Sequence, residues 1–318
     1  MQSASNSNRN PVTVLWVLLA ITGAIANEAF YIIVKRYIAV LDPRVLTAVG
    51  FILGALILFC LAALQGFPVI GPEYFFAVAV SALLNIIGLV LIFSALSSSD
   101  LSLSMPMLSF TPAFLVGTSY ILLHEVPSLL GIAGICIIVS GSYVLNISGE
   151  HEHVLDPVKS MIRNRGSWFM LIVAFLFAAS INYDKIAMLN SDPVFGMTFT
   201  LLAIGGAFVP LSFSGRWKFP VNTLPDRDQL TVTGTPVVKY LPYIVPSLLV
   251  AFFAALESVS INIAYTLQIV PYVISIKRLS IIFMVLYGTI ACHERGLATR
   301  FLGAVLMVGG AVIILLFA

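Results

Sequence analysis

Lys277 and Arg278 stand side by side in PYVISIKRLSIIF, a segment that otherwise has the composition of a membrane span. An ionisable residue near the middle of a span costs about 2.5–3.5 kcal/mol on insertion scales, so it faces a partner or a water-filled cavity by default. Neighbouring helical positions lie about 100° apart around the axis, so both cations cannot point squarely at one atom. We predict that Lys277 attracts an anionic ligand group, and that Arg278 lies at the cavity edge or pairs with a carboxylate.

Polar residues near this pair predict a lined cavity. The connection at 268–271 is short, so helices 241–267 and 270–292 should form an antiparallel hairpin with Asn262 and Lys277 at similar depth, roughly 10 Å from the turn. Residues three or four apart share a helix face. Two such stripes are present, Ser258, Asn262 and Tyr265 on the first helix and Lys277, Ser280 and Tyr287 on the second. Further candidate substrate-binding residues are Asn27, Glu28, Tyr31, Asn182, Tyr183 and the adjacent Asp184.

Glu257, near the centre of 241–267, has two interpretations. Its carboxylate could carry a coupling proton or accept a substrate amine, or it could only neutralise Lys277 or Arg278. The charged pair has a rival interpretation of the same kind, as a structural ion pair with Glu257 or Glu28 that involves no ligand. The sequence leaves these alternatives open.

Several other polar residues suit structural roles. Asn85 fits a hydrogen bond between helices, while Lys35 and Lys185 lie near span ends and should extend to the membrane interface. Pro106 and Pro112 interrupt the span 101–123 beside several hydroxyl residues, as in the broken helices that line transporter cavities. Two glutamates at turns, Glu125 and Glu294, are expected to cap helix ends or stabilise a gate rather than contact substrate.

The composition places these residues in a membrane. Of the 318 residues 60% are hydrophobic and 9% are charged, unlike a soluble domain. A span needs roughly 20 apolar residues, and we predict ten, at 13–37, 45–65, 73–95, 101–123, 127–147, 167–187, 194–212, 241–267, 270–292 and 298–317. Such long uniform runs exclude barrel strands. The predicted fold class is therefore an all-α membrane protein.

The two halves of the chain repeat the same residues. A His-Glu pair followed by two glycines occurs as His124, Glu125, Gly134 and Gly141 and again as His293, Glu294, Gly303 and Gly310. A lysine and an Asp-Pro pair recur as Lys35 with Asp42-Pro43 and Lys185 with Asp192-Pro193. Five spans in each half, an odd number, predict an inverted repeat, with halves at 13–147 and 167–317 and a linker at 148–166.

The segment HEVPSLLGIAGICIIVSG and its counterpart HERGLATRFLGAVLMVGG resemble the end of an EamA-type repeat. Ten spans in two such halves resemble the drug/metabolite transporter superfamily over nearly the whole chain. Locally, VISIKRLSIIF is similar to the ninth helix of the triose-phosphate/phosphate translocators, whose adjacent Lys-Arg pair helps to bind the substrate phosphate. The resemblance is specific for fold but weak for substrate.

We therefore predict a secondary transporter that moves a small polar or anionic metabolite by alternating access, by proton coupling or by exchange. The main alternative is an exporter of amino acids or amphipathic cations, with Glu257 or Glu28 as the counter-charge. An intramembrane enzyme is disfavoured because the histidines lack H-E-x-x-H spacing and no G-x-S-x-G elbow occurs. A non-transporting receptor would need a large sensing domain, and the longest loop is 214–240.

The expected partners are the substrate, membrane lipids and possible coupling protons. A net charge of +2 gives no basis for nucleic acid binding, and neither the cysteines nor the histidines are spaced for a metal or cofactor. The expected location is the bacterial inner membrane, with multiple passes. Counting basic residues in alternate loops places both termini outside, whereas relatives in the superfamily generally have both in the cytosol; the loop count is preferred here.

Overall fold

The computed structural model describes residues 9–37, 42–98, 105–146, 165–213, 236–282 and 297–317, and within these ranges every regular element is helical. Eleven helical elements follow one another. They are α1 (Arg9–Tyr37), α2 (Pro43–Gln65), α3 (Tyr74–Ser98), the 3-10 helix η1 (Met105–Phe110), α5 (Thr111–Leu123), α6 (Leu129–Asn146), α8 (Arg165–Leu189), α9 (Thr198–Phe213), α10 (Pro236–Leu267), α11 (Val270–Lys277) and α13 (Leu297–Phe317). The predicted all-α class is confirmed.

Most predicted spans match a helix to within a few residues. By length and apolar composition, five helices in the described residues can cross a membrane, at 12–30, 44–65, 74–92, 168–189 and 244–267. Four shorter apolar helices occupy 107–123, 129–145, 198–213 and 301–317. The predicted span 101–123 is interrupted, as its prolines indicated, because η1 gives way to α5 at Thr111 with Pro112 in the first turn.

The repeated Asp-Pro pairs both order a turn. Asp42 accepts a hydrogen bond from the backbone amide of Arg44 at 2.8 Å and caps α2, with Pro43 in the first turn. Asp192 accepts hydrogen bonds from the amides of Val194 and Phe195, both at 2.7 Å, in the connection before α9. Each carboxylate therefore satisfies amides that lack a partner of their own.

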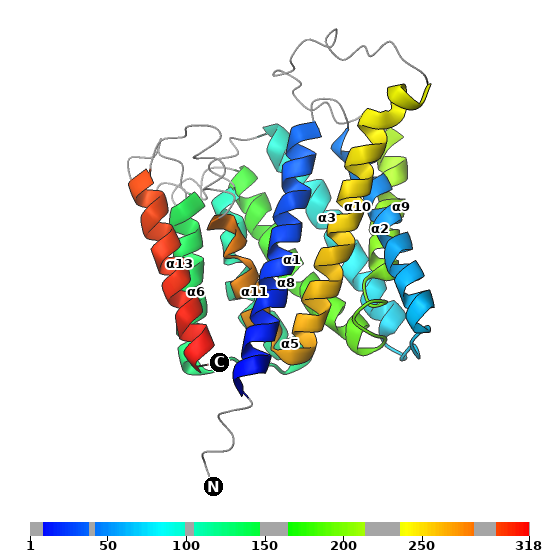
Figure 1. The fold of residues 1–318 in the computed structure, drawn as a ribbon. Helices are drawn as coiled ribbons and strands as arrows, with labels where there is room; N and C mark the ends of the chain where they lie inside the picture. Colours follow the sequence, from blue (N-terminus) through cyan, green and yellow to red (C-terminus); the bar gives the residue numbers. More distant parts are fainter. Residues whose placement is uncertain are drawn as a thin grey trace.

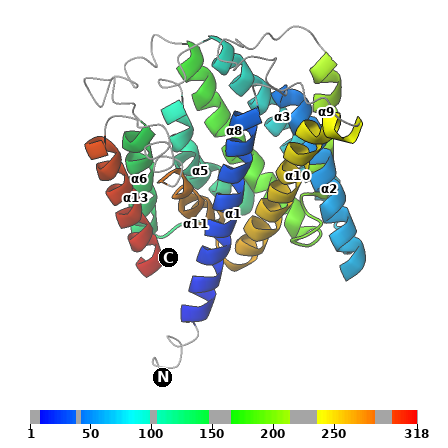
Figure 2. The same ribbon diagram turned by 45° about the horizontal axis from the view of Figure 1, so that its top comes forward.

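The helices form one bundle in which elements from the two halves of the chain lie side by side (Figure 1). α6 and α13 lie together at one edge, and α2 and α9 lie at the other edge in both views (Figures 1 and 2). Between the edges, α1 packs against α10 and α3 packs against α8, while α11 contacts α1, α5 and α6. The start of α1 and the end of α13 lie at the same end of the bundle (Figure 1).

The glycines of the two repeated motifs face one another across α6 and α13. A Cβ atom at Gly134 would lie 2.9 Å from the carbonyl oxygen of Gly310, and one at Gly303 would lie 2.7 Å from that of Gly141. The first glycine of each helix therefore meets the second glycine of the other, which requires the two helices to run antiparallel. Close packing was predicted for these glycines, and their backbones are in direct contact.

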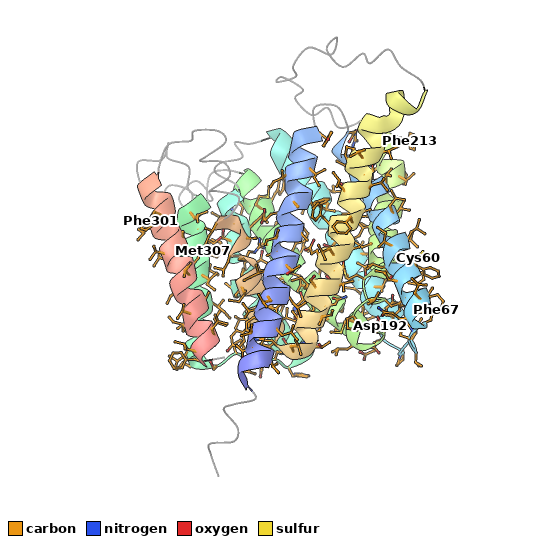
Figure 3. All side chains as sticks on the ribbon, in the orientation of Figure 1. Cys60, Phe67, Asp192, Phe213, Phe301 and Met307 are labelled. Atoms are coloured by element: carbon orange, nitrogen blue, oxygen red, sulfur yellow. The ribbon has the colours of Figure 1, made fainter. Side chains whose placement is uncertain are left out.

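Side chains around α13 show the separation of buried and exposed faces. Met307 is fully buried against α6 and the largest core cluster, whereas Phe301 is exposed (Figure 3). Many other large apolar side chains, such as Phe213 and Phe67, are exposed on the outside of the bundle (Figure 3). An apolar outer surface of this extent is consistent with contact to lipid rather than water.

Candidate functional site

α11 stops at the charged pair. Its last residue is Lys277, and beyond it the amides of Leu279, Ile281 and Ile282 bond to the carbonyl three residues earlier, at 3.0, 3.2 and 3.0 Å. This tighter pattern is that of a 3-10 turn. The predicted span over 270–292 is therefore helical at 270–277 and 280–282 with a turn at 278–279 between them, and 283–296 lie outside the described residues. Cations suit this position because the carbonyl end of a helix carries partial negative charge.

Lys277, Glu257 and Asn27 converge from α11, α10 and α1. The Lys277 ammonium donates a hydrogen bond to the Glu257 carboxylate and forms an ion pair with it. The Asn27 amide nitrogen donates to both Glu257 oxygens, each at 3.0 Å. Glu257 thus has a cation and a neutral donor around one carboxylate. The ion pair named as the rival interpretation is present, and it leaves the ligand role of Lys277 as a proposal.

Glu28 extends the same cluster. Its carboxylate accepts a hydrogen bond from the Ser280 hydroxyl at 2.8 Å, and the charges of Arg278, Lys277 and Glu257 all act on it. The side chains of Lys277 and Glu257 keep 20% and 23% of their surface exposed. Both side chains are therefore only partly buried, although Glu257 lies well inside the apolar length of α10.

A second charged cluster lies near the last residues of α5, α8 and α10 and the first residue of α11. Lys185 donates to the Glu125 carboxylate at 2.6 Å and to the carbonyl of Gln268 at 3.3 Å. The other Glu125 oxygen accepts a hydrogen bond from the amide of Val270, the first residue of α11, at 2.8 Å. Glu125 therefore caps a helix end, as predicted, although the helix it caps is not its own neighbour in sequence.

Lys185 does not extend to the interface as the sequence suggested. Its side chain is only 9% exposed, and Glu125 is 10% exposed. The ammonium lies 5.9 Å from the ring centre of Tyr265, within cation–π range. A carboxylate from the connection after α5 and an aromatic ring from α10 hold this lysine inside the bundle, and the sequence around residue 185 does not reveal either neighbour.

Three predicted site residues are committed to contacts within the protein. Ser258 donates to the Ala254 carbonyl of its own helix at 2.8 Å, and Asn262 donates to the Pro193 carbonyl at 2.9 Å. The Asn182 amide donates to Thr118 and Ala178 at 2.9 and 2.8 Å and accepts from Ser119 at 2.6 Å. Asn182 joins α8 to α5, the role expected of Asn85. Lys277 contacts Glu257 rather than Asn262, the residue expected at its depth; the two positions are about 7 Å apart along α10.

Tyr183 and Asp184 face α3. The Tyr183 ring packs edge-on against Phe76 at 6.2 Å, and Asp184 accepts a hydrogen bond from Ser81. Asn85 also bridges these helices, donating to Ser180 at 2.6 Å, as predicted. The side chain of Tyr31 and all of Tyr287 lie outside the described residues, as do Glu294 and the side chain of Lys35.

Ser81 and Ser180 were not among the predicted site residues. Ser81 precedes Asn85 by four positions, and Ser180 precedes Asp184 by four. Polar residues one turn apart on two apolar helices share a face, so this spacing is a signal by which both serines could have been found.

Fold and site together define a multi-pass helical membrane protein with paired charges in its interior. Residues 14–147 match the sequence model of the EamA-like transporter family. The match covers less than half of the chain; over these residues it confirms the predicted resemblance to the drug/metabolite transporter superfamily, and the matched family is one of transporters.

A solved crystal structure, described simply as that of a protein, aligns with 98% of this chain and 98% of its own. Its TM-score is 0.64 and its sequence identity is 15%, so the likeness concerns the fold alone. None of the curated proteins compared with the sequence matches it.

Proposed function

We propose that this protein is a secondary transporter that moves a small polar or anionic metabolite by alternating access. The observation that carries the proposal is the Lys277–Glu257 pair. Its side chains are about twice as exposed as those of the Lys185–Glu125 pair, although the latter lies at the helix ends. Charged residues that stay partly exposed inside an apolar bundle are typical of a substrate pathway.

Lys277 is the group that would bind the substrate. In the empty site its charge is neutralised by Glu257, and an anionic substrate would take over that role. Glu257 would keep its two contacts to Asn27 during the exchange. Because the lysine always has a carboxylate or a substrate anion beside it, the cation is never left unpaired in a low-dielectric site.

In this proposal, the contacts of Glu125 with Lys185 and Val270 close one end of the substrate pathway. They tie α8 to the loop after α5 and to the first residue of α11. The substrate could leave towards this end only if these contacts separate. In this proposal the ion pair and the helix cap stabilise one of the two states that alternating access requires.

We also propose that residues 13–147 and 167–317 are inverted repeats joined by 148–166. In such a repeat α1 corresponds to α8, α2 to α9, α3 to α10 and α6 to α13. Exchanging the halves then turns the α1–α10 contact into the α8–α3 contact and leaves α2–α9 and α6–α13 unchanged. All four contacts are present. The crossed glycine pairs of α6 and α13 have the same symmetry. Superposition of the two halves with an axis in the membrane plane tests this proposal.

A second candidate is the export of amino acids or amphipathic cations. It is favoured by Glu28, whose carboxylate accepts from the neutral Ser280 hydroxyl, a donor that a substrate ammonium group could replace. Here Glu28 or Glu257 would be the counter-charge. Binding of cations that is lost in Glu28→Gln but kept in Lys277→Gln would favour this function over anion transport.

The test begins with a thermal-shift screen of phosphorylated sugars, nucleotides, amino acids and drugs, because a ligand stabilises the state it binds. For an anionic hit, Lys277→Gln should weaken binding by about one to two decades, the loss of one charge-assisted contact. Lys277→Arg is the control, since it keeps the charge. Unchanged affinity in a folded Lys277→Gln protein would make the lysine structural.

Counterflow in proteoliposomes then separates a carrier from a receptor. A carrier loaded with unlabelled ligand should draw labelled ligand into the vesicles. A receptor would bind the same ligand and give no counterflow.

A further inference from the structure

Asp184 is a carboxyl group inside the bundle that the proposed substrate site does not use. It lies on α8 and accepts a hydrogen bond from Ser81 of α3. None of the ion pairs formed within the described residues includes it. An ionised carboxylate without a cation is costly in a low-dielectric environment.

The surroundings of Asp184 are neutral donors already engaged with one another. Ser81 and Ser180 lie 3.0 Å apart, and the Asn85 amide donates to Ser180 at 2.6 Å and to the Ser81 carbonyl at 3.0 Å. The hydroxyl oxygens thus have protein partners, which leaves few lone pairs for a metal cation. A proton needs only one carboxylate oxygen.

The charges near Asp184 come from two other helices. The charges of Lys277 of α11 and Glu257 of α10 act on Asp184, and the charge of Asp184 in turn acts on Tyr265 of α10. The helix segments η1, α3 and α5 also pack on α8 and contain no titratable residue except Tyr74 and Tyr120. Glu257 differs from Asp184 because it already has Lys277 as a direct partner.

We infer that Asp184 is the proton-binding site of this transporter, and that a proton bound there favours an anion bound at Lys277. The inference rests on the proposed function for its second part. A proton from water forms an O–H bond with the carboxylate and removes one negative charge. Since an anion at Lys277 adds a negative charge nearby, each ligand strengthens the binding of the other by the same factor. Proton and anion would then cross together.

Infrared difference spectra between acidic and alkaline buffer test the proton site without any substrate. The parent protein should gain the C=O band of a protonated carboxyl group in acid. Asp184→Asn should lose this band and Glu28→Gln should keep it; Glu28 is the matched control because it also accepts from a single serine. A band that persists in Asp184→Asn and disappears in Glu28→Gln would overturn the assignment.

Ser81→Ala keeps the test decisive if Asp184→Asn does not fold. Removing the hydroxyl donor should shift the frequency of the band, and an unshifted band would assign it to another carboxyl group.

Transport tests the coupling. In proteoliposomes the uptake of the anionic hit should rise with an inward proton gradient in the parent, and Asp184→Asn should lose that response. A response that survives would overturn the coupling role. If no anion gives counterflow in the parent, the transport proposal fails, while the infrared result on Asp184 stands.

Discussion

Two ion pairs inside the described part of the bundle differ in a way that their positions alone would not suggest. Lys185–Glu125 joins helix ends but is nearly closed off, with 9% and 10% of the side chains exposed, while Lys277–Glu257 lies deeper and keeps 20% and 23%. Distance from the end of the bundle does not decide exposure. The end pair has a backbone amide and an aromatic ring packed around it, whereas the inner pair stays partly exposed.

Glu125→Gln should have the largest effect on stability of the substitutions considered. It leaves Lys185 without its carboxylate in a closed site, which for a buried pair costs about 3–5 kcal/mol. Titration with SDS in mixed micelles measures the free energy of unfolding. The double variant Glu125→Gln with Lys185→Met should recover most of the loss, because no charge then remains unpaired. If Glu125→Gln lowered the free energy of unfolding by less than Glu257→Gln does, the expected order of the two ion pairs would be contradicted.

Glu257→Gln should cost less, about 2 kcal/mol, because the remaining Lys277 is partly exposed. The same substitution should strengthen the binding of an anion, since the lysine no longer has a competing carboxylate. Calorimetric titration with the hit from the thermal-shift screen measures this. Weaker anion binding in a stable Glu257→Gln protein would show that Glu257 supports the substrate site rather than competing with the substrate.

Gly303→Ala provides a reference contact without charges, with an expected loss of about 1–2 kcal/mol. The added Cβ would lie 2.7 Å from the Gly141 carbonyl oxygen, and that backbone cannot easily move. Gly309→Ala is the matched control on the same helix, because a Cβ there meets nothing within 4 Å. It should be neutral or slightly stabilising through its helix propensity. Equal unfolding free energies for the two variants would contradict the tight contact.

Asp42→Asn should give the smallest effect, about 0.5–1 kcal/mol, because asparagine can still cap α2 and Arg44 keeps its hydrogen bond to the Leu211 carbonyl oxygen. Burial acts to raise the pKa of Asp42, but the hydrogen bonds and charge of Arg44 outweigh it, so the pKa lies below its ordinary value. The stabilisation is therefore present above the unfolded pKa, about 3.9, and is lost as pH falls through the folded value. A pH series of thermal unfolding should show this loss in the parent and not in Asp42→Asn.

The helices were predictable because each is a long apolar run whose position depends on its own composition. Glu125 as a cap and the glycine contact also followed from local motifs, although the capped helix could not be named. Other features depend on atoms from distant parts of the chain. They are the burial of Lys185, the use of the Asn182 amide in hydrogen bonds within the protein, and the interruption of the helix after Lys277. The sequence alone does not say which helix supplies those atoms.

The glycine contact between α6 and α13 makes each half of the molecule incomplete by itself. A chain cut after residue 147 would keep α6 but lose the partner whose backbone fills the hollows at Gly134 and Gly141. A helix with two glycines at the same spacing, running the other way, fits those hollows. A second copy of the same fragment inserted upside down supplies such a helix, so a separately made half should form an antiparallel pair with itself.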